Sequence, residues 1–297
     1  MSPITVVEGR RLPLTRLDKV LYPETGTTKG EVLHYVTTTA GALLAHLHDR
    51  PVSFLRYPDG PGGQRFFTKN VPPGTPAWVK TCEVPSRAAK SGRQVLLQDL
   101  ASLVWAANLV VELHAPQWTR DTPGTADRLV LDLDPGAPAT LVDCCAVARW
   151  LRDRLAADGL LSCVKTSGSK GLHLLTPIEP APSEDATAYA RALATEAAAA
   201  LPDLVTARMR KDLRPGKVFL DYSQNAAAKT TACAYTLRAR ATPTVSTPVT
   251  WDEVAACTEP AQLTFLFGEI TARLARYGDL FAPLLDPHRA RPLPRTG

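Results

Sequence analysis

The stretch LVLDLDPG, residues 129–136, ends an apolar run with two aspartates set two positions apart. Side chains alternate between the faces of a strand, so Asp132 and Asp134 would share one face and the intervening leucines the other. Two carboxylates this close repel each other unless a cation lies between them, and hard oxygen ligands suit Mg²⁺ or Mn²⁺. The alternative is an acidic turn, because Asp and Pro-Gly also favour turns.

A third carboxylate for such a metal site occurs in KVFLDYS, residues 217–223. In a short strand, Asp221 would share a face with Phe219, which is an uncommon pattern for a strand that faces solvent. We therefore expect Asp221 to bind metal together with the first two carboxylates. The alternative is that its side chain caps the following turn.

The segment KTSGSKGLH, residues 165–173, has the composition of a phosphate-binding loop. Its two glycines let the backbone come close to a ligand, Ser167 and Ser169 offer hydroxyls, and Lys170 adds positive charge. His173 follows the loop directly and would face the same site. The loop is not a Walker A sequence, and no GxGxxG motif follows a strand. A flexible hairpin is the alternative.

Helical and extended patterns alternate along the middle of the chain. An apolar stripe of helical period predicts a helix over residues 139–159 that ends at Gly159. The remaining predicted elements are helices over residues 99–110 and 183–201, strands over residues 111–118, 129–136 and 217–223, and a strand, loop and strand over residues 161–178. This interleaving predicts a mixed α/β architecture.

The first clear helix is expected over residues 25–47. Thr28 is a good N-cap, and Glu31 completes a capping box three residues later. Lys29 and Gly30 would then lie in the first turn among free backbone N–H groups, which together make a seat for a phosphate. The alternative is a solvated lysine on a well-capped helix.

Adjacent aromatic residues lie in the basic segment GGQRFFTKN, residues 62–70. Phe66 and Phe67 stand between Arg65 and Lys69, an arrangement that can stack on a nucleobase while the charges meet the nucleic-acid backbone. Burial of the two rings in the core is the alternative.

Further basic groups follow Asp221 in KTTACAYTLRAR, residues 229–240. Lys229 opens this segment, and Arg238 and Arg240 would share a face if the chain is extended there. Of the histidines, His114 in ELHAPQW is open to two interpretations, a ligand contact or a hydrogen-bonded core histidine.

Composition restricts the class of protein only loosely. The chain has 297 residues, 45% of them hydrophobic, and a net charge of +5, which permits a polyanionic partner without requiring one. No apolar run is long enough to cross a bilayer and the N-terminus lacks a secretion signal, so we expect a cytoplasmic, nucleoid-associated protein with no membrane contact. The six cysteines have no metal-binding spacing. We expect one domain over residues 1–297 with a frayed tail over residues 285–297.

Five segments together resemble the polymerase domain of the bacterial end-joining DNA ligase D, a branch of the archaeo-eukaryotic primase superfamily. In chain order they are LDKVLYPETGTTKGEVLHYV, ELHAPQW, RLVLDLDPG, KTSGSKGLHLLTPI and KVFLDYSQNAAAKTTACAYTLRAR. The resemblance extends from about Leu12 to about Leu284. It implies a primase-polymerase fold, with an RRM-like catalytic sheet flanked by helices and an N-terminal mixed α/β module.

The resemblance also implies an activity: a template-dependent nucleotidyltransferase that fills short gaps at DNA breaks in end joining or excision repair, prefers ribonucleotides and works with two Mn²⁺ or Mg²⁺ ions. Its implied partners are DNA with a 5′-phosphorylated gap or break, NTP or dNTP, and a DNA ligase and Ku, and it implies a monomer. A primase and a catalytically silent DNA-end binding module are the alternatives. A pure DNA binder has no reason to hold three carboxylates near a polyanion. A metal-dependent glycosyltransferase would share the DxD but leave Asp221 and the phenylalanine pair unexplained.

The resemblance implies a role for each matching residue. The metal-binding and catalytic residues would be Asp132, Asp134 and Asp221. The contacts to the incoming nucleotide would be His114, Ser167, Ser169, Lys170, His173, Gln224, Lys229 and Arg238. On the DNA side, Lys19 and Lys29 would hold the 5′-phosphate, Phe66 and Phe67 would stack on the template, and Arg240 would contact the strand. The chain departs from the family at residues 16–17, where Arg-Leu replaces the frequent Asn-Pro, and it carries no KxDG ligase motif.

Overall fold

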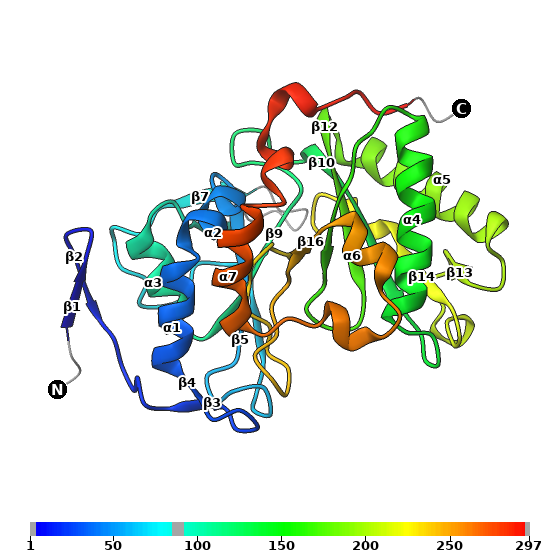
Figure 1. The fold of residues 1–297 in the computed structure, drawn as a ribbon. Coiled ribbons are helices and arrows are strands. Elements are labelled where there is room, and N and C mark those ends of the chain that lie inside the picture. Colours follow the sequence, from blue (N-terminus) through cyan, green and yellow to red (C-terminus); the bar gives the residue numbers. More distant parts are fainter. Residues whose placement is uncertain (1–3, 85–91, 295–297) are drawn as a thin grey trace. The chain divides into compact units, whose positions relative to one another are not determined.

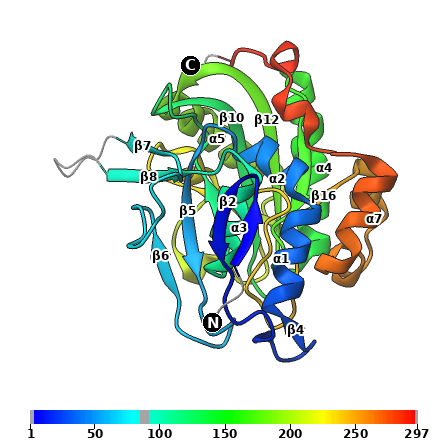
Figure 2. The same ribbon diagram turned by 90° about the vertical axis from the view of Figure 1, so that its left-hand side faces the viewer.

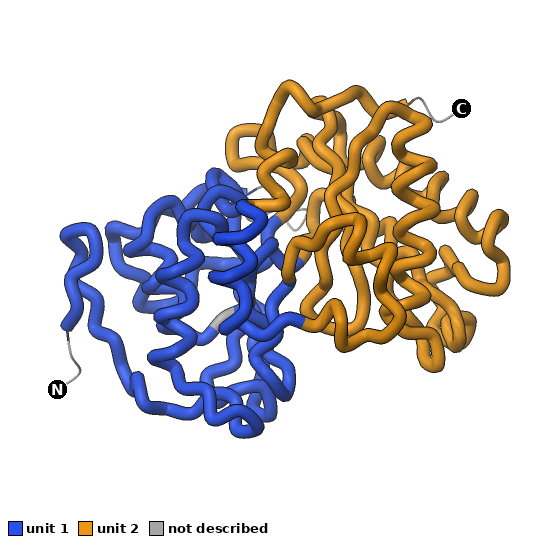
Figure 3. Tube along the Cα trace, in the orientation of Figure 1, with its two compact units in different colours: residues 1–115, 232–246, 265–278 blue, residues 116–231, 247–264, 279–297 orange. Residues whose placement is uncertain are grey.

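The computed structural model describes residues 4–84 and 92–294, which divide into two compact units (Figure 3). The first unit comprises residues 1–115, 232–246 and 265–278, and the second comprises residues 116–231, 247–264 and 279–297. Each unit is therefore built from segments that are far apart in the chain.

The second unit is built on a sheet with the strand order β13-β14-β10-β12-β11-β16. These strands are β10 (Thr125–Pro135), β11 (Cys163–Thr166), β12 (Leu172–Pro182), β13 (Val205–Thr206), β14 (Val218–Asp221) and β16 (Pro248–Val249). All neighbouring strands run antiparallel except β13 and β14, which are parallel. The predicted strand around the two aspartates and the predicted strand, loop and strand after it are thus confirmed.

Helices cover one face of this sheet. Helix α4 (Leu141–Ala157) and helix α5 (Ser183–Ala200) both contact β10 and β12, and Figure 1 shows them beside these long strands. Leu131 and Leu133 of β10 are buried. The predicted stripe of α4 is buried as well, because apolar residues at helical spacing turn one side of a helix toward the sheet. Asp132 and Asp134 alternate with the leucines and belong to the other face.

Shorter helical segments complete the second unit. They are η1 (Lys211–Leu213), η2 (Tyr222–Asn225), α6 (Trp251–Ala256), η3 (Pro260–Leu263), η4 (Ala282–Leu285) and η5 (Pro287–Arg289). The expectation of a frayed tail from residue 285 is wrong as far as Arg291, because η4 and η5 contact β12 and the Glu179 N–H donates to the Arg291 carbonyl at 2.9 Å. Residues 295–297 lie outside the described part.

The first unit contains a sheet with the strand order β15-β9-β5-β8-β7, and β6 also pairs with β5. Its strands are β5 (Pro51–Arg56), β6 (Phe66–Thr68), β7 (Thr81–Val84), β8 (Gly92–Leu96), β9 (Val111–Ala115) and β15 (Thr231–Ala232), the last at the boundary between the units. Two small antiparallel pairs precede it, β1 (Ile4–Val7) with β2 (Arg10–Pro13) and β3 (Val20–Tyr22) with β4 (Thr27–Thr28).

Helices of the first unit pack together beside this sheet (Figure 2). They are α1 (Lys29–Thr38), α2 (Ala40–Leu47), α3 (Leu100–Asn108) and α7 (Phe267–Tyr277). The predicted helix over residues 25–47 is in fact α1 and α2, interrupted at Thr39. The hydroxyls of Thr38 and Thr39 both donate to the Tyr35 carbonyl, and such side-chain bonds to the preceding turn bend helices. No helix in the described residues is long and apolar enough to span a bilayer.

Candidate active site

A row of ionisable residues crosses the face of the second unit's sheet that lies opposite α4 and α5. Asp221 of β14 lies opposite Asp132 of β10, Asp132 lies opposite His173 of β12, and His173 lies opposite Lys165 of β11. Residues directly opposite in an antiparallel sheet project to the same side. The four side chains therefore share one face. Asp134, two residues after Asp132 on the same strand, belongs to that face as well.

Asp134 is the exposed carboxylate of this group. Although the residue as a whole reaches solvent, the surrounding protein partly desolvates its carboxylate, and repulsion from Asp132 adds to this effect. Together they raise the pKa of Asp134 to about 6. Asp221 raises this pKa further, whereas the positive charge of Arg214 lowers it. The face thus concentrates negative charge, which is the electrostatic condition for binding a divalent cation.

Asp221 also has a second task, as the cap of η2. Its Oδ1 accepts hydrogen bonds from the Ser223 N–H at 3.0 Å and the Ser223 hydroxyl at 2.6 Å, and its Oδ2 accepts one from Gln224 Nε2 at 2.9 Å. The alternative interpretation of Asp221 as a turn cap is therefore confirmed. Its charge nevertheless acts on Asp134.

The three carboxylates fit a hard cation by their chemistry, because Mg²⁺ and Mn²⁺ prefer oxygen ligands. In the described residues, however, no three His, Cys, Asp or Glu side chains come close enough together to hold an ion. One physical reason is the engagement of Asp221 with Ser223 and Gln224. A metal that used all three carboxylates would require Asp221 to turn away from its cap.

The serine- and glycine-rich loop after β11 is tightly closed. The Ser167 hydroxyl oxygen accepts hydrogen bonds from the Ser169 N–H at 3.2 Å and the Gly171 N–H at 3.1 Å, and the Ser167 N–H donates to the Gly171 carbonyl. A Cβ at Gly171 would lie 1.9 Å from the Leu133 carbonyl oxygen, so only glycine lets the loop approach β10 this closely. The loop therefore connects a hairpin of β11 and β12 next to the aspartates, and its hydrogen bonds close it on itself.

The other predicted nucleotide contacts of the second unit lie around this face. Lys170 at the tip of the loop and Lys229 after η2 are exposed, Ser169 is half-buried, and the Gln224 amide is bound to Asp221. Each of these residues lies on a loop or a short helical turn at the ends of the strands, where binding residues are commonly carried.

Two basic residues of this region were missed by the sequence analysis. Lys165 was counted only as the first residue of the loop segment, and Arg214 was not considered. The Arg214 guanidinium lies 3.6 Å from the centroid of the Phe219 ring, and its Nη2 donates to the Met209 carbonyl at 2.7 Å. A Cβ at Gly136 would lie 2.2 Å from the Arg214 carbonyl oxygen, which explains the glycine at the end of LVLDLDPG. The signal for Arg214 was its place five residues before Phe219, but only the fold reveals the proximity.

Another buried carboxylate organises the first unit. Glu112 of β9, which the sequence analysis also missed, binds His114 Nε2 at 3.1 Å, Arg238 Nε at 2.9 Å and the Ala239 N–H at 2.9 Å. Burial alone would raise the pKa of Glu112, but the hydrogen bond from His114 and the charge of Arg238 lower it to about 2. His114 and Arg238, both predicted nucleotide contacts, are thus held by one anion.

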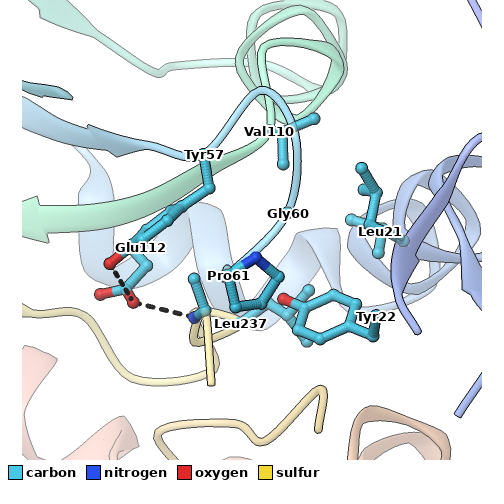
Figure 4. Close-up of a pocket in the computed structure, with 10 residues that line it drawn as sticks. Leu21, Tyr22, Tyr57, Gly60, Pro61, Val110, Glu112 and Leu237 are labelled. Atoms are coloured by element: carbon cyan, nitrogen blue, oxygen red, sulfur yellow. Dashed lines mark hydrogen bonds between the residues drawn. The ribbon is translucent and has the colours of Figure 1, made fainter. Parts of the chain in front are cut away.

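Glu112 also lines a pocket of the first unit. Figure 4 shows Glu112 and Tyr57 at one side of this pocket and Tyr22, Gly60 and Pro61 among its other walls. The Tyr57 hydroxyl donates to Glu112 at 3.4 Å, and the Tyr22 hydroxyl donates to the Arg238 carbonyl at 3.0 Å. Arg238 is thus held at its backbone by Tyr22 and at its side chain by Glu112.

Comparison with known proteins decides the family. Residues 28–281 match the model of the LigD primase-polymerase domain. The chain belongs to the LigD primase-polymerase domain family. It is therefore a DNA-directed nucleotidyltransferase of the primase-polymerase type, and the predicted fold and family are confirmed.

Two relatives and one solved structure illustrate the similarity. The chain is 42% identical over 278 residues to the multifunctional non-homologous end joining protein LigD of Mycolicibacterium smegmatis, covering 92% of this chain and 36% of that protein. It is 30% identical over 282 residues to the bifunctional LigD of Bacillus subtilis, covering 94% of this chain and 44% of the relative. The polymerase domain of Mycobacterium tuberculosis Ligase D in complex with DNA matches with a TM-score of 0.88 and 41% identity, over 93% of this chain and 98% of that one. The chain thus spans less than half the length of these LigD relatives.

The candidate phosphate-binding lysines of this LigD-type domain are close to one another in the first unit. Lys19 Nζ binds Asp59 and the Pro58 carbonyl at 2.6 and 2.7 Å, and Lys29 Nζ donates to the Thr15 carbonyl at 2.9 Å. Lys29 is 5% exposed. Its desolvation and the like charges of Lys19 and Arg16 lower the pKa of Lys29 to about 8.

The expectation of free backbone N–H groups at the start of α1 is wrong at two positions. The capping box of Thr28 and Glu31 is confirmed. The N–H of Lys29, however, donates to the Lys19 carbonyl, and the N–H of Gly30 donates to the Leu17 carbonyl, each at 2.8 Å. A phosphate there would depend on the basic side chains. The departure from the family sequence is visible too, because Arg16 has a φ of 54°, a left-handed conformation that asparagine adopts more readily than arginine.

The residues predicted to stack on the template lie in a short strand of the first unit. Phe66 and Phe67 on β6 are 43% and 55% exposed, so the core alternative for the pair is wrong. Lys69 Nζ lies 6.0 Å from the centroid of the Phe67 ring. The expectation that Arg238 and Arg240 share the face of an extended segment is also wrong, because the Arg240 N–H donates to the Arg238 carbonyl at 3.0 Å and the chain turns between them.

Proposed function

We propose that the chain is a template-dependent polymerase that fills short gaps at DNA breaks, preferring ribonucleotides, in end joining or excision repair. We propose further that both units work as one primase-polymerase domain. The observation that carries the proposal is that Asp132, Asp134 and Asp221 share one face of the β10 sheet, beside a closed serine- and glycine-rich loop. A protein that only bound DNA ends would gain nothing from this negative charge.

In this reaction the primer 3′-hydroxyl attacks the α-phosphate of a nucleotide, and pyrophosphate leaves. Asp132, Asp134 and Asp221 would hold two Mn²⁺ or Mg²⁺ ions. When bound, these ions would neutralise the charge of the phosphates and help to deprotonate the hydroxyl. Asp221 would exchange its hydrogen bonds with Ser223 and Gln224 for the new ligand.

The remaining residues would bind and orient the nucleotide. Ser167, Ser169, Lys170 and Lys229 supply hydroxyls and positive charge for the triphosphate oxygens, which carry most of the ligand's charge. His114 and Arg238 are held by Glu112, so their donors are already oriented before a ligand arrives. We assign His173 and Gln224 to the carboxylate side of the nucleotide site, since each already contacts one of the carboxylates.

On the DNA side, Lys19 and Lys29 would grip the 5′-phosphate at the far end of the gap. Each would give up its present carbonyl or carboxylate contact in exchange for phosphate oxygens. Phe66 and Phe67 would stack on the template, since they are exposed aromatic rings next to the basic residue Lys69. Arg240 would contact the strand.

The proposed partners follow from the relatives. The M. smegmatis and B. subtilis proteins carry the name of non-homologous end joining, and the M. tuberculosis polymerase domain was solved with DNA. We therefore propose a gapped or broken DNA substrate, cooperation with a DNA ligase and Ku, a monomeric state, and a site of action at the nucleoid in the cytoplasm.

Primer extension tests the proposal. The wild-type chain is incubated with Mn²⁺ and either NTPs or dNTPs on a gapped duplex whose downstream strand carries a 5′-phosphate or a 5′-hydroxyl. We expect templated extension that stops at the end of the gap, with NTPs used faster and the 5′-phosphate favoured. Synthesis on a single-stranded template without a primer would instead indicate a primase. Binding of the gapped duplex without any synthesis would indicate an end-binding module.

A further inference from the structure

Lys165 is the most deeply buried ionisable residue of the row, with 1% of its surface exposed. Lysines are almost never fully buried unless they are paired, because removing the ammonium group from water is costly. Lys165 lies in β11, between β12 and the edge strand β16, opposite His173 on one side and Pro248 on the other. Its charge is therefore directed along the row toward the carboxylates.

The contacts along the row have a direction. Lys165 Nζ lies 2.8 Å from His173 Nδ1, and His173 Nε2 lies 3.2 Å from Asp132 Oδ1. An ammonium group donates hydrogen bonds and accepts none, so a charged Lys165 requires Nδ1 to be the acceptor. The imidazole proton then belongs on Nε2, where it points at the Asp132 carboxylate.

We propose that Lys165 is a positioning residue for the polymerase reaction, which fixes the tautomer and orientation of His173 so that Nε2–H holds Asp132 in place. The inference rests on the proposed function, since it takes Asp132 to be a catalytic carboxylate. Lys165 touches no substrate in this account and acts only through His173. Residues that orient metal ligands in this way change activity by about 10- to 100-fold when removed.

The strand register explains why the contacts from Lys165 through His173 to Asp132 form only on this face of the sheet. The next residues on the opposite face, Val164 of β11 and Leu174 of β12, pair with each other and are buried and apolar. If the side chain at position 165 only filled space, an apolar residue would serve there as it does at position 164. Lys165 instead occupies the one β11 position opposite His173.

The wild-type chain provides the first test, without metal or substrate. Long-range ¹H–¹⁵N correlation spectra of the imidazole rings report which nitrogen carries the proton, and the His173 signals are identified by their loss in His173→Gln. We expect His173 to carry its proton on Nε2, with Nδ1 as a hydrogen-bond acceptor. A proton on Nδ1 in the wild type would overturn the proposal.

The second test compares Lys165→Met with Val164→Ala by the same spectra and by primer extension. Lys165→Met keeps most of the stem and removes the donor, so we expect altered His173 nitrogen signals and a kcat about 10- to 100-fold lower, with KM for the nucleotide within about twofold. Val164→Ala perturbs the same strand from the other face and should leave both the signals and kcat unchanged. A Lys165→Met protein with wild-type kcat, or equal losses in both variants, would overturn the proposal.

A double variant separates the relay from a general effect of charge. In His173→Gln, the side chain no longer accepts from Lys165, so adding Lys165→Met should lower kcat by no more than about twofold further. If the losses in kcat of the two single variants multiply in the double variant, Lys165 does not act through His173 and the proposal is contradicted. Should Lys165→Met fail to fold, the wild-type spectra alone decide. Failure of the wild type to extend primers would refute the proposed function, whereas the position of the His173 proton is measured independently of it.

Discussion

Lys165 and Lys29 are both buried lysines, with 1% and 5% of their surface exposed, but the charged residues near them have opposite signs. Lys165 stands at the end of a row that includes two carboxylates, so its charge is balanced inside the protein. Lys29 has a backbone carbonyl as its acceptor and feels the like charges of Lys19 and Arg16. The first arrangement suits a permanent structural contact, and the second suits an anion that arrives from outside.

Glu112 extends the comparison to a buried acid, and among the residues compared with the two lysines it has the largest expected effect. With His114, Arg238 and Ala239 as partners, it is balanced like Lys165, and its pKa of about 2 lies below its ordinary value of 4.5. This contribution to stability, about 3 kcal/mol, is therefore present above about pH 4.5 and is lost as the pH falls toward 2. We expect Glu112→Gln to lower the free energy of unfolding at pH 7 by about this amount and to flatten its acid limb, as measured by urea denaturation from pH 3 to 7. An acid limb as steep as that of the wild type would show that Glu112 is not balanced.

Lys29→Met should separate the two lysines by function. A charge-assisted hydrogen bond to a phosphate contributes about 1.5–3 kcal/mol, so the preference for a 5′-phosphorylated gap over a 5′-hydroxyl gap should fall by about 10- to 100-fold. Extension of an ungapped primer–template should not change. The control is Lys165→Met, for which the opposite is expected: a lower kcat and an unchanged phosphate preference. If Lys29→Met keeps the preference for the 5′-phosphate, Lys29 does not bind the phosphate, and the proposed difference in role between Lys29 and Lys165 is wrong.

The pH dependence of the phosphate preference gives a smaller but more specific effect. Because desolvation, Lys19 and Arg16 lower the pKa of Lys29 to about 8, the side chain is charged at pH 7 and loses its proton as the pH rises above 8. We expect the ratio of extension on 5′-phosphate and 5′-hydroxyl gaps to decline by up to about tenfold between pH 7 and pH 9.5. Lys29→Arg, which stays charged, should show a flat ratio over this range. A declining ratio in that variant would assign the titration to another group.

Local patterns predicted the elements that carry the site. Alternation placed Asp132 and Asp134 on one face, the capping box placed the start of α1, and the apolar stripe placed the buried side of α4. The three threonines at 37–39 are a local signal for the break between α1 and α2, which the single helix predicted over residues 25–47 did not include.

Local sequence patterns could not predict the register between strands. That register determines which ionisable side chains lie opposite one another in the row. Nothing in CVKT indicates that Lys165 lies opposite His173, because that pairing depends on how the Ser167–Gly171 loop closes. Glu112 was equally hidden, since its partner Arg238 is 126 residues away. Arg240 was misjudged because a turn separates it from Arg238. In each case a contact between distant segments, rather than a propensity, determines the result.

One measurement tests the central claim most directly, that the carboxylate face of the β10 sheet performs nucleotidyl transfer. It is the single-turnover rate of gap filling by Asp134→Ala against the wild type, with Mn²⁺ and with binding of the gapped duplex measured in parallel. Loss of a metal-holding carboxylate removes several kcal/mol of charge stabilisation, so we predict a rate lower by about a thousandfold with DNA binding within about twofold. A variant that fills the gap at the wild-type rate would contradict the account.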